Sequence, residues 1–282
     1  MKRSATIAAA LILAAALGAK AQDCQALYNR LVERVGYAGV GVETVLDKWE
    51  KADSTDINMM VGRFSYWFAK SRRDTVEMMD CKKYLGSKPL VALKDSTGAP
   101  KNYFEVQYYD DTAFGNGIKW LDKAIRRDNT RLDVRMLKAD ALVAYEKGSP
   151  DLTLQLLLDV IKENFTKNSK WEYPGEKVDA TFFDQQIQNI CFILFSQGTE
   201  GSYEAFKTIS ATMLKYEKNN ANFLCNMGAY FQSAKGDDKK AATYYKKVLK
   251  TDPDNEVAKK NMDLIARKAK IAAAKKAAAK NK

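Results

Sequence analysis

The chain has 282 residues, with 46 lysine and arginine residues against 35 aspartate and glutamate residues, and it contains no histidine. The lack of histidine excludes catalytic pairs that use an imidazole base, HExxH zinc sites and imidazole metal ligands. Five prolines and abundant lysine, alanine and leucine favour a mostly helical fold.

Residues 1–21 have the pattern of an export signal rather than of a folded segment. A basic start is followed by an apolar run from Ala5 to Gly18 and by the small-x-small cleavage pattern Ala19-Lys20-Ala21. The apolar run, about 14 residues, is too short to span a bilayer. We therefore expect an exported protein that begins near Gln22 and is periplasmic or associated with the outer envelope. An uncut membrane anchor is the alternative.

Three helices are expected before residue 72. The first runs from Cys24 to Val35 and the second from Val42 to Ala52, each with apolar residues at helical spacing. The third begins at the capping cluster 53–56 and continues to Phe68. The glycine-rich stretch 36–41 lacks the GK[ST] ending of a phosphate-binding loop, and we interpret it as a helix–helix turn.

The helical pattern is interrupted near 86–112. Strand-like stretches at 90–93 and 103–109 flank a cluster of turn residues at 95–100. This arrangement predicts an ordered non-helical insertion that contains a small hairpin.

Asp110 and Asp111 form a tight carboxylate pair beside aromatic residues. Because carboxylate pairs can hydrolyse glycosides, a carboxylate-dependent hydrolase is an alternative function. Adjacent residues of an extended segment point to opposite sides, however. Capping of the next helix is therefore the favoured role for this pair.

After the insertion, helices resume in pairs. A polar loop is expected over 165–179. Up to residue 216, the expected helices are 113–127, 131–147, 151–163, 184–197 and 201–216.

The stretch 221–254 carries the most specific pattern. Two apolar blocks at helical spacing are separated by the break 234–238 and followed by the turn Asp252-Pro253-Asp254. In spacing this resembles a tetratricopeptide repeat (TPR). The signature positions are occupied by Leu224, Met227, Gly228, Phe231, Ala241, Tyr245 and Pro253.

The overall layout resembles exported TPR proteins of Gram-negative bacteria. This resemblance implies an all-α, TPR-like solenoid of helical hairpins with a non-helical insertion near 86–112. It also implies a non-catalytic scaffold without cofactor, which binds a protein or peptide partner through a concave helical groove. The expected organisation is a signal peptide (1–21), an N-terminal helical region with the insertion (22–112), TPR-like repeats (113–254), and a capping helix with a basic tail (255–282).

The resemblance implies a partner-binding face as well. In a TPR pair, one side of the first helix is exposed to the groove, and in this chain that side would carry Gln185, Gln188, Asn189, Phe192, Asn222, Asn226 and Gln232. Amides four residues apart stack on one helix face and offer donors and acceptors to an extended peptide. Arg135 occupies a matching position upstream and could meet a carboxylate. A solvated face without a partner is the alternative.

Four cysteines in an oxidising compartment can form two disulfides. Cys24 and Cys81 are one candidate pair. Cys191 and Cys225 lie on apolar helix faces, where a cysteine acts as a small hydrophobe, and a bridge between them is less favoured. Metal binding by these isolated cysteines is not expected.

The net charge is concentrated at the carboxyl end. Residues 22–258 contain 34 basic and 34 acidic residues, whereas nine basic residues and one acidic residue follow from Lys259 onward. A capping helix is expected from Asn255, and the alanine–lysine tail from Ala266 to Lys282 is expected to fray or be disordered. The tail could be a solvated end or could adhere to an anionic envelope surface. Nucleic-acid binding is not expected for an exported protein.

Overall fold

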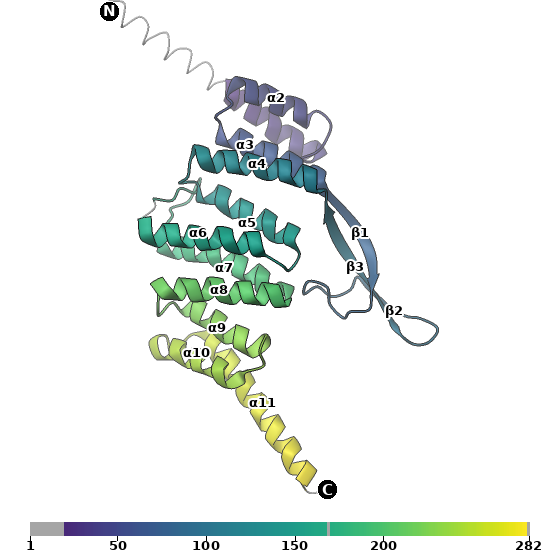
Figure 1. Cartoon of the computed structure of the whole chain (residues 1–282), viewed down its shortest axis with the longest axis vertical. Helices are drawn as coiled ribbons and strands as arrows, with labels where there is room; N and C mark the ends of the chain where they lie inside the picture. Colours follow the sequence, from purple (N-terminus) through teal and green to yellow (C-terminus); the bar gives the residue numbers. More distant parts are fainter. Residues whose placement is uncertain (1–19, 168–169, 281–282) are drawn as a thin grey trace, which may run out of the picture. The chain divides into compact units, whose positions relative to one another are not determined.

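The computed structural model describes residues 20–167 and 170–280, with side chains described up to residue 275. Nearly all of the predicted signal peptide therefore lies outside the described residues. The described chain is mostly helical (Figure 1). It divides into two compact units. Unit 1 contains the chain up to Lys82, Pro89–Ala141 and Lys170–Glu176, and unit 2 contains Lys83–Lys88, the segment from Leu142 and the chain from Lys177 onward. Across the described helices, none is long and apolar enough to traverse a membrane.

The helices of unit 1 begin and end close to their predicted limits. They are the segment 20–35, α2 (Val42–Ala52), α3 (Ile57–Ser71), α4 (Asp111–Arg127) and the part of α5 (Leu132–Glu146) up to Ala141. The side chain of Asp56 accepts a hydrogen bond from the Asn58 backbone N–H and caps α3, as predicted. Gly41 at the start of α2 has a φ of 88°, which glycine adopts without strain, and the stretch 36–41 is the expected turn.

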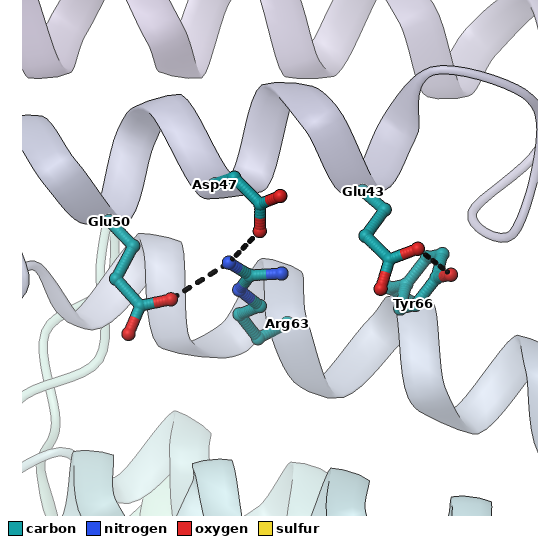
Figure 2. Close-up of polar contacts among 5 residues, drawn as sticks. All are labelled: Glu43, Asp47, Glu50, Arg63 and Tyr66. Atoms are coloured by element: carbon teal, nitrogen blue, oxygen red, sulfur yellow. Dashed lines mark hydrogen bonds and ion pairs between the residues drawn. The ribbon is translucent and has the colours of Figure 1, made fainter.

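A polar network joins α2 to α3 (Figure 2). The guanidinium of Arg63 donates from Nη2 to Asp47 at 2.6 Å and to Glu50 at 2.8 Å. One turn further along α3, the Tyr66 hydroxyl donates to Glu43 at 2.8 Å. The three acidic residues lie on one face of α2 because their spacing follows the helical repeat. Since Arg63 is buried, this network fixes how α3 sits on α2.

The insertion contains a three-stranded sheet, one strand more than the predicted hairpin, within a chain that is otherwise mostly helical as expected. The strands are β1 (Arg72–Met79), β2 (Val91–Lys94) and β3 (Pro100–Tyr109), antiparallel and in the order β1-β3-β2. The predicted hairpin corresponds to β2 and β3. The non-helical segment begins at Arg72 rather than near residue 86, because β1 follows α3 directly and pairs with a distant strand.

The two faces of this sheet differ in burial. Asn102, Phe104 and Val106 of β3 are buried on one face, and the Asn102 side chain donates to the Cys81 carbonyl oxygen at 2.9 Å. The opposite face carries exposed apolar side chains from β1 and β2, including Met78 and Val91. The sheet therefore buries one face and exposes the other.

Unit 2 is built mainly of consecutive helices, and short turns join those from α7 onward. They are α6 (Asp151–Lys167), α7 (Ala180–Gln197), α8 (Glu200–Tyr216), α9 (Ala221–Ser233), α10 (Asp238–Thr251) and α11 (Glu256–Lys280). Side-chain oxygens of Asp179, Thr199, Asn220 and Asp237 cap α7 to α10 by accepting backbone N–H groups. Capping by Asp179 explains why α7 begins four residues before the predicted start. α6 continues to Lys167, into part of the predicted loop 165–179.

The two helices of the α9–α10 hairpin are in close contact at Gly228. A Cβ atom added at Gly228 would meet the Tyr245 ring at 2.5 Å, so the two helices approach closely because this position has no side chain. Tyr245 is fully buried, with Leu224, Ala241 and Val248 in the same apolar cluster. Ala258 of α11 joins the cluster, so the start of α11 covers the hairpin as the predicted capping helix does.

The basic tail is helical as far as the structure describes it. α11 continues without a break to Lys280, so the expectation that the tail frays from Ala266 is wrong for these residues. Alanine and lysine have high helix propensities and can extend a helix whose start is already anchored. The side chains from 266 to 275 are all exposed, which agrees with the lack of apolar residues to dock them.

Candidate functional site

The first helix of the α7–α8 hairpin presents an exposed row of side chains. Gln185 donates from Nε2 to Asn189 Oδ1 at 2.9 Å, and both residues are exposed. Phe192 follows one turn later and is 71% exposed, the largest exposed fraction of any aromatic side chain among the described residues. These three predicted groove residues therefore lie together on one face of α7, where a partner could contact both amides and an aromatic ring.

Gln188 and Asn226 bind each other instead of facing solvent. Gln188 Nε2 donates to Asn226 Oδ1 at 2.9 Å, and Asn226 Nδ2 donates to Gln188 Oε1 at 2.8 Å. Asn226 also donates to Ser210 Oγ at 3.1 Å and is buried. The prediction that Asn226 lines the groove is wrong, because Asn226 ties α9 to α7 and α8. Gln188 is half-buried beside it. Helical periodicity in the sequence predicts on which side of its own helix a residue lies. It does not predict which neighbouring helix covers that side.

The two remaining positions on α9 differ from each other. Asn222 is exposed at the start of the helix, as expected for a groove residue. Gln232 accepts a hydrogen bond from the Tyr245 hydroxyl at 3.0 Å and is half-buried. Gln232 therefore supports the packing of α10 on α9, and within unit 2 the exposed candidates that remain are Gln185, Asn189, Phe192 and Asn222.

Arg135 does not line a groove. Its side chain is buried, with the guanidinium carbon 5.0 Å from the centre of the Trp171 ring. Its Nη2 donates to the Asn129 carbonyl oxygen at 3.0 Å. The prediction that Arg135 meets a partner carboxylate is therefore wrong, because the loop carrying Trp171 covers it.

A cleft in unit 1 was not predicted. It has a volume of about 620 Å³ and lies between α3 and α5, with the start of β1 at one end. Its apolar part consists of Phe64, Phe68, Ala69, Leu137 and Ala141, and its polar part of Tyr37, Ser65, Arg72, Asp74 and Asp140. The sequence contains a signal for this cleft, namely apolar pairs four residues apart on both helices. Such pairs more often lie in the buried core of a protein, however.

An ion pair forms part of the polar wall of this cleft. Arg72 donates from Nε and Nη2 to the two carboxylate oxygens of Asp74, both at 2.9 Å. The hydrogen bonds from Arg72 lower the pKa of the Asp74 carboxyl from its ordinary value. An apolar concavity with a few oriented polar groups is the usual form of a ligand or peptide site.

The carboxylates considered for hydrolysis have structural roles. The Asp110 side chain accepts a hydrogen bond from the Ala113 backbone N–H at 2.8 Å and caps α4. Asp111 lies in the first turn of that helix, where a negative charge is favourable. This arrangement matches the predicted capping role.

A second carboxylate pair lies where α7, α8 and α9 meet. Asn220 donates from Nδ2 to Asp184 at 2.6 Å and to Glu217 at 2.9 Å. Desolvation and the nearby charge of Glu217 raise the pKa of Asp184 to about 7. The pair therefore holds a proton near neutral pH, and Asn220 links it to the cap of α9.

The four cysteines are free thiols in this structure, Cys24 and Cys81 included. Cys191 and Cys225 are buried, and burial raises the pKa of the Cys225 thiol to about 11. Both therefore act as small apolar side chains, as expected. Among the described residues, no group of three metal-ligating side chains of the Cys, Asp and Glu types comes together.

Comparison with protein-family models, with curated proteins and with solved structures gave no match for this chain. The likeness to TPR proteins therefore rests on the residues of the chain itself.

Proposed function

We propose that this protein is an exported, non-catalytic TPR-like scaffold that binds a protein partner through the first helices of its hairpins. The observation that carries the proposal is the exposed row Gln185, Asn189 and Phe192 on α7. Covering an aromatic side chain of this exposure contributes about 1.5–3 kcal/mol to binding. The proposed location is the periplasm or the outer envelope, in line with the pattern of residues 1–21.

The repeat architecture is supported by the packing of two signature residues. Gly228 and Tyr245 occupy the positions where the resemblance places a small residue and an aromatic residue, and the ring fills the space left by the glycine. Val248 and Ala241 are fully buried in the same hairpin. The contact of Gly228 with Tyr245 and the burial of Ala241 agree with a repeat of two antiparallel helices, whereas Val248 stands where the repeat usually has alanine.

The chemistry of the exposed row favours an extended protein segment as the partner. The Gln185 and Asn189 amides can exchange their mutual hydrogen bond for bonds to a peptide backbone. Phe192 offers an apolar contact for one side chain of that segment. The α3–α5 cleft of unit 1 offers a second contact of similar character, apolar with a polar wall.

Adhesion to an anionic envelope surface is a second candidate, supported by the exposed lysines of α11. Lys270 and Lys275 are exposed on a helix that makes few apolar contacts beyond Ile265. Each lysine near an anionic surface contributes up to about 1 kcal/mol. This function would add to partner binding and does not replace it.

The experiment that tests the scaffold proposal is an affinity capture from envelope extract with matched variants. The purified protein and its Phe192→Ala variant are used as bait, and Leu152→Ala on α6 is the control because Leu152 is also exposed, at 57%. We expect Phe192→Ala to lose a bound protein that Leu152→Ala retains, with unchanged thermal melts. Identical bound proteins for all three baits would contradict the proposal.

A further inference from the structure

Strand β1 has an open edge. It pairs with β3 on one side, and across the described residues its backbone makes no hydrogen bond outside that ladder. Figure 1 shows the sheet of unit 1 extending away from the ends of α3 and α4. The strand runs over Arg72–Met79 without a proline or a lysine. Its charged side chains, which can also protect an edge, are two basic and two acidic and can therefore pair with those of another strand. An edge of this length is a template for another strand.

The register shows which groups face outward. The Asp110 N–H donates to the Ser71 carbonyl oxygen at 2.8 Å, so residues 71 and 110 form a hydrogen-bonded pair just beyond the ladder. Because such pairs alternate, the odd-numbered residues of β1 point their backbone groups toward β3. The even-numbered residues, from Arg72 to Met78, therefore point their N–H and C=O groups at the open edge.

The side chains of the same even-numbered residues lie on the exposed face of the sheet. Val76 is 58% exposed and Met78 is 52% exposed. Met78 and Val91 are both opposite Tyr103 of β3, so β2 adds its own apolar side chains to this face. An apolar face next to an open edge is a feature of association surfaces.

The charge sequence of β1 matches a second copy of itself. When two β1 strands run antiparallel about a two-fold axis at Thr75, Arg73 of each copy lies opposite Glu77 of the other. The outward backbone groups meet in this register, because residue 72 pairs with 78 and residue 74 with 76. A shift of one copy by two residues either places Asp74 opposite Asp74 or leaves Arg73 without an acidic partner.

Both charged side chains already lie on one face of β1. Glu77 accepts a hydrogen bond from the Tyr108 hydroxyl at 2.6 Å, and the Arg73 guanidinium lies 5.8 Å from the centre of the Tyr108 ring. Tyr108 therefore holds the two groups in place before association. Opposite charges directly across antiparallel strands stabilise the pairing, and like charges weaken it.

We propose that two copies of this chain associate by antiparallel pairing of β1 with β1 about Thr75, so that two three-stranded sheets become one. The occupant of the open edge is a second copy because β1 is self-complementary in charge and backbone geometry in the same register. This assembly is independent of the proposed partner site on α7.

The test is the molar mass of the purified protein by light scattering and its sedimentation between about 1 and 100 µM, a range that spans micromolar dissociation constants. We expect a concentration-dependent dimer. Val76→Pro should give a monomer, because it removes an outward N–H while leaving the bonds to β3 intact. A wild-type monomer throughout this range would overturn the proposal and leave the edge to a strand of another protein.

Charge reversal gives a second and independent readout. Arg73→Glu creates two like-charge pairs and should weaken dimerisation about tenfold. Adding Glu77→Arg to that variant reverses both charges and should restore the dimer. A dimer that is indifferent to the single reversal, or that the double reversal does not rescue, would show that this register is wrong even if Val76→Pro fails to fold.

Discussion

Substituting Gly228 with alanine tests the close packing of α9 on α10. In an open helix this change would stabilise the fold by about 1 kcal/mol, because glycine is a poor helix former. Here the new Cβ would lie 2.5 and 2.6 Å from two atoms of the Tyr245 ring, about 1 Å inside van der Waals contact. Overpacking of a core costs about 1–3 kcal/mol. Because Tyr245 is fully buried and its hydroxyl donates to Gln232, a shift of the ring would displace packed neighbours and strain that hydrogen bond.

We therefore expect Gly228→Ala to lower the free energy of unfolding by about 2 kcal/mol. This figure is the upper end of the overpacking cost, about 3 kcal/mol, less the gain in helix propensity of about 1 kcal/mol. The measurement is urea unfolding followed by far-ultraviolet circular dichroism. Gly115→Ala in α4 is the matched control, since a Cβ there meets no atom within 4 Å, and it should stabilise by about 0.5–1 kcal/mol. A Gly228→Ala variant as stable as Gly115→Ala would refute the packing argument.

Three further results are expected. Because the folded chain keeps the Asp184 proton up to about pH 7 while the unfolded chain releases it near pH 4, stability should fall across that range. Asp184→Asn should remove this loss and raise the free energy of unfolding by about 1 kcal/mol at pH 8, a figure reduced for the partial exposure of Asp184. Thermal melts at several pH values should show no such gain below pH 4. Arg135→Ala should cost about 2 kcal/mol in urea unfolding, through lost cation–π and hydrogen-bond contacts, and should leave partner capture unchanged. Deleting Lys268–Lys282 should abolish co-sedimentation with anionic vesicles at low salt. The melting temperature should change little, because the deleted side chains described up to residue 275 are all exposed and the ion pair of Lys268 with Asp238 is partly exposed.

Local signals predicted most of the helices. The capping roles of Asp56 and Asp110 and the turn at 36–41 could be predicted because each depends on residues within one helical turn. Long-range partners account for the errors. β1 depends on β3, which follows it after a loop and another strand, and its polar first half has no apolar alternation.

The candidate site follows the same rule. The spacing of Gln185, Asn189 and Phe192 was sufficient to place them on one exposed face of α7. The burial of Asn226 and Arg135 depends on contacts with Gln188 and Trp171, which lie in other elements. Helical periodicity cannot predict such contacts. The α3–α5 cleft could not be predicted because its lining is largely apolar, and apolar residues are expected to be covered by other elements.

The scaffold proposal is tested most directly by photo-cross-linking from the exposed face of α7. A photoreactive amino acid replaces Phe192, or in the control Leu152, and the protein is irradiated in envelope extract. We expect a covalent adduct of defined mass from position 192 that is absent from position 152, since Leu152 lies outside both of the proposed contacts with the partner. No adduct from position 192, or the same adducts from both positions, would contradict it.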